Sequence, residues 1–323
     1  MKRLFMFTIA VAIFCFFVVS KQVLAQTEAE AKDSGTLAVV LSRNIQPYQN
    51  AFQGFIEVLN NKGYKFGVTT NYDLKGDVNQ ASAIAQEIKR QKPDLILTVG
   101  TEATKAMSTY ITDIPIVFSM ALISNLSDSE KAQTNLTGAS MSVSLAAQLK
   151  ELNAILPQAR KIGIICSSGY YSAHFSEREK AATASMGVQL IVKFAKNETE
   201  FTDAVKVILP DIDVFLFVPD ETILSPRTTQ FILLETFRTN KPVIAPSLRL
   251  VQDGALFALA SDYTDIGRQS AELAIQILQG NKVADLPVTE ARTTHLYLSL
   301  RTAKQMGIPI PQGIISRADK IFE

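Results

Sequence analysis

Residues 95–107 read LILTVGTEATKAM, and this stretch decides the fold. Its first half is a run of apolar and β-branched residues of the kind found in buried strands, and its second half opens a helix at Thr101 and Glu102. Open α/β sheets bind ligands beyond the carboxyl ends of their strands, where each strand passes into the next helix. The stretch therefore predicts a strand-to-helix unit whose polar junction either faces a ligand or simply starts the helix.

The same alternation of strand and helix runs along the rest of the chain. Short β-branched runs predict strands at 36–42, 65–73, 94–100, 114–120, 161–167, 188–195, 213–219, 241–247, 254–261 and 294–300. Amphipathic stretches predict helices at 48–63, 78–93, 101–110, 144–156, 175–187, 198–209, 227–240, 264–280 and 301–307. Strands that alternate with helices form parallel sheets covered on both faces. Because 323 residues suffice for two such units, we expect an α/β fold with two doubly wound parallel-sheet lobes.

The N-terminal segment, residues 1–25, differs in composition from the rest of the chain. A basic start, the apolar run LFMFTIAVAIFCFFVV and the small residues Val23 and Ala25 before Gln26 are typical of a secretory signal peptide. An uncleaved membrane anchor is the alternative, because the run approaches the length of a spanning helix. Both interpretations predict export of the remaining chain.

Charge and cysteine content narrow the class of protein. The formal net charge is +1, and Lys and Arg form no dense cluster, so the sequence lacks the electrostatic footprint of a nucleic-acid binder. Cleavage after Ala25 would remove Cys15 and leave Cys166 without a disulfide partner in the chain. Because Cys166 ends an apolar run, we expect it to be a buried side chain rather than a nucleophile.

Polar residues gather at the expected carboxyl ends of the strands. The candidates for ligand contact are Ser42, Arg43, Thr101, Glu102, Ser119, Ser167, Asp220, Ser247 and Asp262. Their hydroxyls suit hydrogen bonds to a small polar ligand, while Asp220, Glu221 or Glu102 could hold a cationic group and Arg43 a carboxylate. For each position taken alone, the cap of the following helix is an equally good explanation. Only the set as a whole favours a binding site.

Motifs for catalysis are sparse. His174 and His295 lie in different segments without metal-ligand spacing, and we expect both at the surface or in helix caps. The sequence contains no G-x-S-x-G elbow, no P-loop and no dinucleotide fingerprint, which predicts neither an enzyme nor a cofactor. Aromatic residues just beyond strand ends, such as Tyr170 and Tyr263, suit either a cleft wall or ordinary surface packing.

Several stretches, in a fixed order, resemble one protein family. They are VVLSRNIQPYQNAFQGFIEVL (39–59), DLILTVGTEATKAM (94–107), IPIVFSM (114–120), SLAAQLKELNAILPQARKIGIICS (144–167), FVPDETILSP (217–226), KPVIAPSLRLVQDGALFALASDYTDIGRQSAELAIQILQG (241–280) and LYLSLRTAKQMGIPIP (296–311). Together they resemble the ABC-transporter substrate-binding proteins whose better-known members bind aromatic amino acids. The resemblance covers essentially the whole mature chain.

The resemblance implies a class I periplasmic-binding-protein fold, in which a ligand is closed between two hinged lobes. By analogy one lobe takes residues 26–141 plus 262–283, and the other takes residues 142–261 plus 284–323. It also implies a periplasmic monomer that binds a small molecule, an amino acid being one candidate, with an ABC permease as partner. In family terms Thr101 and Glu102 supply a ligand-facing hydroxyl and backbone N–H groups, Ser42 lies opposite the first strand, and Asp220 faces them from the second lobe.

Two departures from the family pattern leave the ligand open. Residues 219–222 read Pro-Asp-Glu-Thr, where the aromatic-amino-acid binders tend to carry a Pro-Thr-Asp-Asn-like run, and Ser299 stands where many relatives have Asn. Two other functions also remain alternatives. One is the ligand-binding component of a membrane sensor, and the other is an exported α/β hydrolase that uses Ser42 or Ser119 as its nucleophile.

Overall fold

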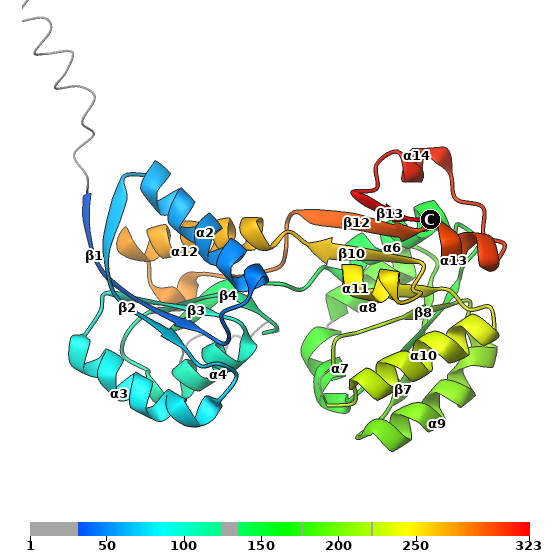
Figure 1. The fold of residues 1–323 in the computed structure, drawn as a ribbon, viewed down its shortest axis with the longest axis horizontal. Coiled ribbons are helices and arrows are strands. Elements are labelled where there is room, and N and C mark those ends of the chain that lie inside the picture. Colours follow the sequence, from blue (N-terminus) through cyan, green and yellow to red (C-terminus); the bar gives the residue numbers. More distant parts are fainter. Residues whose placement is uncertain (1–31, 124–134, 176, 221) are drawn as a thin grey trace, which may run out of the picture.

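The chain folds into two α/β lobes that lie side by side (Figure 1). The structure, a computed structural model, describes residues 32–123, 135–175, 177–220 and 222–323. The expected signal peptide and Glu221 lie outside these residues. Each lobe is built on its own sheet, one of six strands and one of seven. This agrees with the fold class expected from the sequence.

The first lobe has a parallel sheet in the order β11-β5-β4-β3-β1-β2. Its strands are β1 Lys32–Leu41, β2 Tyr64–Asp73, β3 Leu95–Val99, β4 Ile116–Ala121, β5 Leu136–Ser140 and β11 Val288–Thr289. Its helices are α2 Gln46–Asn61, α3 Ala81–Gln91, α4 Thr101–Tyr110 and α12 Tyr263–Leu278, with short 3₁₀ turns η1 Val78–Gln80 and η3 Val283–Asp285. Helices α2 and α12 cover one face and α3 and α4 the other (Figure 1), so β3 and β4 are buried along their whole length.

The second lobe has a mixed sheet in the order β13-β12-β10-β9-β8-β6-β7. Its strands are β6 Lys161–Cys166, β7 Gln189–Phe194, β8 Val214–Leu216, β9 Val243–Ala245, β10 Phe257–Ser261, β12 Thr294–Ser299 and β13 Lys320–Phe322. Only the β10–β12 pair among them is antiparallel. Its helices are α6 Leu145–Ile155, α7 Ser168–His174, α8 Glu177–Ser185, α9 Glu198–Ile208, η2 Leu209–Asp211, α10 Pro226–Arg238, α11 Leu248–Gln252, α13 Leu300–Gln305 and α14 Gln312–Ile315.

Three crossing segments connect the lobes, at residues 141–144, 261–263 and 290–294. They bond to one another, because the Ala291 N–H donates to the Ser142 carbonyl at 3.1 Å and the Asp262 N–H to the Thr293 carbonyl at 3.0 Å. The lobe boundary expected at residue 283 differs from the strand pairing. Val288 and Thr289 pair with Gly138 and Ala139 of the first sheet, so the chain returns to the second lobe only after them. A two-residue strand carries too little pattern to be recognised in the sequence.

Candidate ligand-binding site

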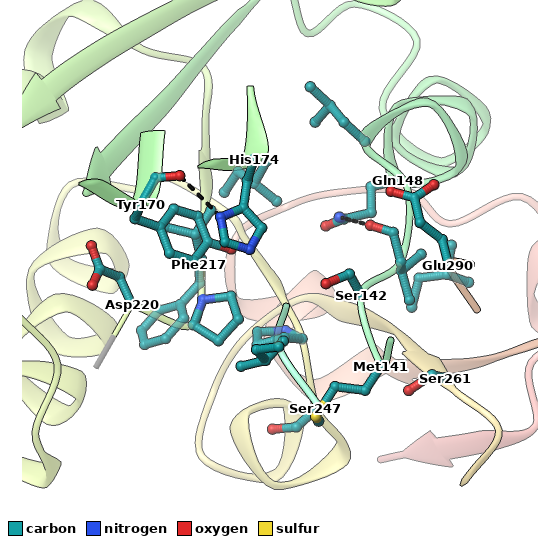
Figure 2. Close-up of a pocket in the computed structure, with 18 of the residues that line it drawn as sticks. Met141, Ser142, Gln148, Tyr170, His174, Phe217, Asp220, Ser247, Ser261 and Glu290 are labelled. Atoms are coloured by element: carbon teal, nitrogen blue, oxygen red, sulfur yellow. Dashed lines mark hydrogen bonds between the residues drawn. The ribbon is translucent and has the colours of Figure 1, made fainter. Parts of the chain in front are cut away.

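A cavity of about 420 Å³ lies where the crossing segments meet the second lobe. It opens at the carboxyl ends of β8, β9 and β10, and its other walls come from α6, α7, α8, α11 and the crossing segments (Figure 2). Leu122 and Tyr263 contribute from the first lobe. This is the edge at which open α/β sheets bind ligands, and the volume lies in the usual range for small-molecule pockets.

Helix α7 supplies an aromatic wall of the cavity. Ser167 starts the helix by accepting a hydrogen bond at its Oγ from the Tyr170 N–H, at 3.1 Å. Tyr170 and His174 then lie one turn apart, with their rings stacked at a centroid distance of 4.0 Å and 12° between their planes. The His174 Nδ1 atom bonds to the Tyr170 carbonyl at 2.9 Å. This wall is therefore fixed by contacts within one turn of helix.

Polar side chains lie across the cavity from α7. Figure 2 shows Gln148, Glu290 and Ser142 on the side of the cavity opposite Tyr170 and His174. The Gln148 Nε2 donates to the Val143 carbonyl at 3.0 Å, which holds the amide in place. The lining is otherwise mainly apolar and includes Met141, Val143, Leu145, Phe175, Leu216, Phe217, Val218, Leu224, Leu250 and Leu259. A ligand with an apolar body and a few polar groups would match it.

The charge of the lining has one sign. Three carboxylates, those of Glu179, Asp220 and Glu290, line the cavity, whereas no Lys or Arg among the described residues does so. Burial lowers the pKa of His174, so its imidazole is neutral at neutral pH. The cavity wall is therefore acidic, and it favours a cationic group over an anionic one.

Asp220 is the buried carboxylate of this wall, at 3% exposure. Its two oxygens accept hydrogen bonds from the Ser167 N–H at 2.6 Å and the Thr222 N–H at 3.0 Å. Burial alone would raise the pKa of the carboxyl, but these hydrogen bonds outweigh it and lower the pKa. Within the described part of the chain no Lys or Arg forms an ion pair with it. Figure 2 places the carboxylate beyond Tyr170, at the edge of the site.

The candidate residues of the second lobe are only partly brought together at the cavity. Asp220 and Ser247 line it. Ser167 lies behind this lining, where it caps α7 and bonds to Asp220. Asp262 caps α12 by accepting from the Asp265 N–H at 3.0 Å, and its neighbour Ser261 lines the cavity instead.

The first-lobe candidates form a second group, around Gly100. The Ser42 Oγ accepts from the Ala103 N–H at 2.9 Å, and the Thr101 Oγ1 accepts from the Leu122 N–H at 3.0 Å. Ser119 is fully buried, and its Oγ has no hydrogen-bond partner among the described residues. These three side chains lie at the carboxyl edge of the first sheet, and none of them lines the cavity.

Arg43 and Glu102 also lie outside the cavity lining. Arg43 is exposed, and its guanidinium lies against Gly76 in the turn after β2. Glu102 is half-buried in the first turn of α4. Both belong to the first-lobe edge.

His174 is half-buried in the last turn of α7, where its Nδ1 atom bonds to the Tyr170 carbonyl. Its side chain belongs to the cavity wall, and its Nε2 atom is buried there without a partner among the described residues. His295 lies outside the cavity lining and bonds through Nδ1 to Asp319 at 3.0 Å. Tyr170 and Tyr263 do line the cavity, in agreement with the cleft interpretation of the aromatic residues. Cys166 is buried as expected, and burial followed by the nearby Asp220 charge raises the pKa of its thiol to about 12.

Sequence reasoning missed Met141, Ser142, Gln148 and Glu290. None of them ends a strand of the second sheet, because they come from the crossing segments and from α6. The only signal in the sequence was their position. Residues between the strands of one lobe and those of the other must lie where the chain crosses between the lobes. Among the described residues no group of three or more His, Cys, Asp or Glu side chains is placed to hold a metal ion.

Comparisons with known proteins agree with this arrangement. A tyrosine-binding protein of Clostridioides difficile is 28% identical over 268 residues, which span 79% of this chain and 76% of that protein. A solved conserved domain protein from Vibrio cholerae is 26% identical, with a TM-score of 0.64 over 90% of this chain and all of that one. An ABC domain from Streptococcus pneumoniae in complex with L-Trp has a TM-score of 0.65 at 21% identity, over 89% of this chain and 99% of that one.

Two α/β lobes joined by three crossing segments, with a cavity at the strand ends between them, define the class I periplasmic-binding-protein fold. The sequence pattern of the family described as ABC transporter substrate binding protein matches residues 38–322. The chain belongs to this family, which consists of binding proteins rather than enzymes, so the hydrolase alternative is discarded. In the part of the chain that the structure describes, no helix has the length and apolar character needed to cross a membrane.

Proposed function

We propose that this protein is the periplasmic substrate-binding component of an ABC importer and that it captures an amino acid between its lobes. The observation that carries the proposal is the lining of the cavity. It combines aromatic and aliphatic walls with three carboxylates and, among the described residues, no Lys or Arg. Such a lining suits a ligand with an apolar body and an ammonium group.

The first-lobe edge supplies the complementary charge for the ligand carboxylate. Helix α4 starts at Thr101, and the first N–H groups of a helix have no partner inside it and carry partial positive charge. The Ala103 N–H donates to Ser42, which leaves the Thr101 and Glu102 N–H groups at the helix start for an anion. Arg43 adds a cation at the same edge. Closure of the lobes would place a zwitterion between the acidic cavity wall and the N–H groups and guanidinium of this edge.

The relatives narrow the class of amino acid. One is named a tyrosine-binding protein, and the fold is shared with a protein solved in complex with L-Trp. The stacked rings of Tyr170 and His174 offer a flat face to an aromatic side chain. We therefore propose aromatic amino acids as the first candidates.

A thermal-shift screen of the mature chain tests the proposal. The ligands are the standard amino acids together with tryptamine and indole-3-propionate, which lack the carboxylate and the ammonium group, respectively. An aromatic amino acid should raise the melting temperature in proportion to occupancy, because it binds the folded state and not the unfolded state. Neither analogue should raise the melting temperature as much as the amino acid does. No shift with any of these compounds would overturn the proposal.

Uptake separates the transport role from the sensor alternative. A strain without this protein should lose high-affinity uptake of the amino acid found in the screen and regain it when the gene is restored. If uptake is unchanged while binding is confirmed, the protein feeds a partner other than a permease.

A further inference from the structure

His174 has a buried ring nitrogen that forms no hydrogen bond with any described residue. The residue lines the cavity from the last turn of α7, and its Nε2 atom is closed to solvent without a hydrogen-bond partner among the described residues. Figure 2 shows this nitrogen on the side of the ring away from the Tyr170 carbonyl and facing the middle of the site. Because an unpaired buried polar atom destabilises the protein, buried polar atoms of native proteins nearly always have a hydrogen-bond partner.

The hydrogen bond on the other side of the ring fixes the chemistry of Nε2. A carbonyl oxygen can only accept, so Nδ1 must carry the proton that it donates to Tyr170 across 2.9 Å. Burial lowers the pKa of His174, which keeps the ring neutral at neutral pH. A neutral imidazole protonated at Nδ1 has a lone pair at Nε2. The orphaned atom is therefore a hydrogen-bond acceptor, and its missing partner is a donor.

The charged groups around the cavity do not provide that donor. Asp220, Glu179 and Glu290 line the same cavity, and ionised carboxylates accept hydrogen bonds only. Gln148, which has an amide donor, lies across the cavity and donates to the Val143 carbonyl. The partner is best supplied by whatever fills the cavity.

We propose that His174 Nε2 accepts a hydrogen bond from an N–H or O–H group on the ligand side chain and so selects a donor-bearing aromatic ring, such as phenol or indole, over plain phenyl. The inference rests on the proposed function, since it concerns the same cavity. A site built to bond a donor rejects a ligand that lacks one, because the acceptor then stays buried and unpaired.

Matched pairs of ligands test this assignment. Calorimetry gives the Kd values of two pairs of ligands, L-tyrosine with L-phenylalanine and L-tryptophan with 1-methyl-L-tryptophan. In each pair only the first ligand carries an O–H or N–H donor on its ring. The wild-type protein should bind the donor-bearing member of at least one pair about tenfold or more tightly, as expected for one buried hydrogen bond. In His174→Phe, which keeps an aromatic ring over Tyr170 but has no acceptor, the affinity ratio should fall to about one. In His174→Gln, which regains an acceptor oxygen, part of the ratio should return.

The outcomes separate this inference from the proposed function. If no aromatic amino acid binds the wild-type protein, the inference fails. The proposed function fails with it only when the other amino acids of the thermal-shift screen also give no shift. If both members of each pair bind the wild-type protein equally, only the assignment of His174 is overturned, whatever the variants do. An unchanged ratio in a folded His174→Phe variant also overturns it, since a lost packing contact would weaken both members alike.

Discussion

Gly100 governs the first-lobe edge, which holds half of the proposed site. Its backbone has a φ of +93°, a conformation that side chains with a Cβ rarely adopt. A Cβ at this position would lie 2.5 Å from the Ser42 Oγ and 2.8 Å from the Tyr48 hydroxyl. Glycine thus lets β3 turn into α4 and lets two side chains approach the junction. The positions of Thr101 and Glu102 depend on that turn.

Gly100→Ala should lower the free energy of unfolding by about 2–4 kcal/mol, from backbone strain plus the steric conflict. Chemical denaturation measures the change. Gly63→Ala is the matched control, because Gly63 has a φ of +80° but nothing within 4 Å of its added Cβ. It should cost only about 1 kcal/mol. Equal losses in the two variants would mean that the approach of Ser42 and Tyr48 is not tight.

Asp220 is either a ligand contact or a cap for the two loops that bond to it, and substitution separates these roles. If its carboxylate holds the ligand ammonium, Asp220→Asn should weaken binding by roughly 2–4 kcal/mol, because a buried charge loses its partner. The Asn side chain keeps an oxygen for one of the N–H donors, so the melting temperature of the free protein reports the capping role. Unchanged affinity with a lowered melting temperature would leave Asp220 a structural residue.

At the scale of elements, Arg292 fixes one crossing segment to α12. Its Nε and Nη atoms bond to both oxygens of Asp265, at 2.8–3.2 Å, and Nη1 bonds to Glu272 at 2.8 Å. Asp265 is buried, which alone would raise its pKa, but hydrogen bonds from Arg292 and Thr293 and the Arg292 charge lower it. The crossing segment is thereby tied to the first-lobe helix that begins at the hinge.

Arg292→Gln should lower the free energy of unfolding by about 1–2 kcal/mol near neutral pH, allowing for the water that reaches the guanidinium. The folded pKa of Asp265 lies below its unfolded value of about 3.9, so this stability is present above that pH and is lost as the pH falls through the folded pKa. The difference between the two proteins should therefore vanish in acid. Arg249→Gln, which breaks an exposed pair with Asp253, should change nothing measurable. A pH-independent difference would contradict this account of Asp265.

The sequence predicted elements with a strong pattern and missed the weak ones. The helix expected at 101–110 is α4, because the strand before it and the turn at Gly100 mark its start. Strand β5, LTGAS, has few apolar residues, and helix α7, SGYYSAH, is too short for a period to emerge. The residues that line the cavity were predictable to the same extent. Strand ends predicted Asp220 and Ser247, whereas His174 became a wall residue only because the fold places α7 beside the carboxyl end of β8.

For the whole molecule, the arrangement of crossing segments favours hinged closure. The lobes have separate sheets and separate cores, and the three crossing segments bond to one another and to α12 of the first lobe. Few contacts would break if one lobe rotated towards the other. Rotation of this kind would carry the α4 start towards the cavity and enclose a ligand between them.

Small-angle X-ray scattering of the mature protein, titrated with L-tyrosine and L-tryptophan, tests the central claim that a ligand is captured between the lobes. The account predicts that the radius of gyration falls as occupancy rises and reaches a plateau at saturation for whichever amino acid binds. A radius of gyration that stays constant at ligand concentrations where calorimetry shows saturation would contradict it.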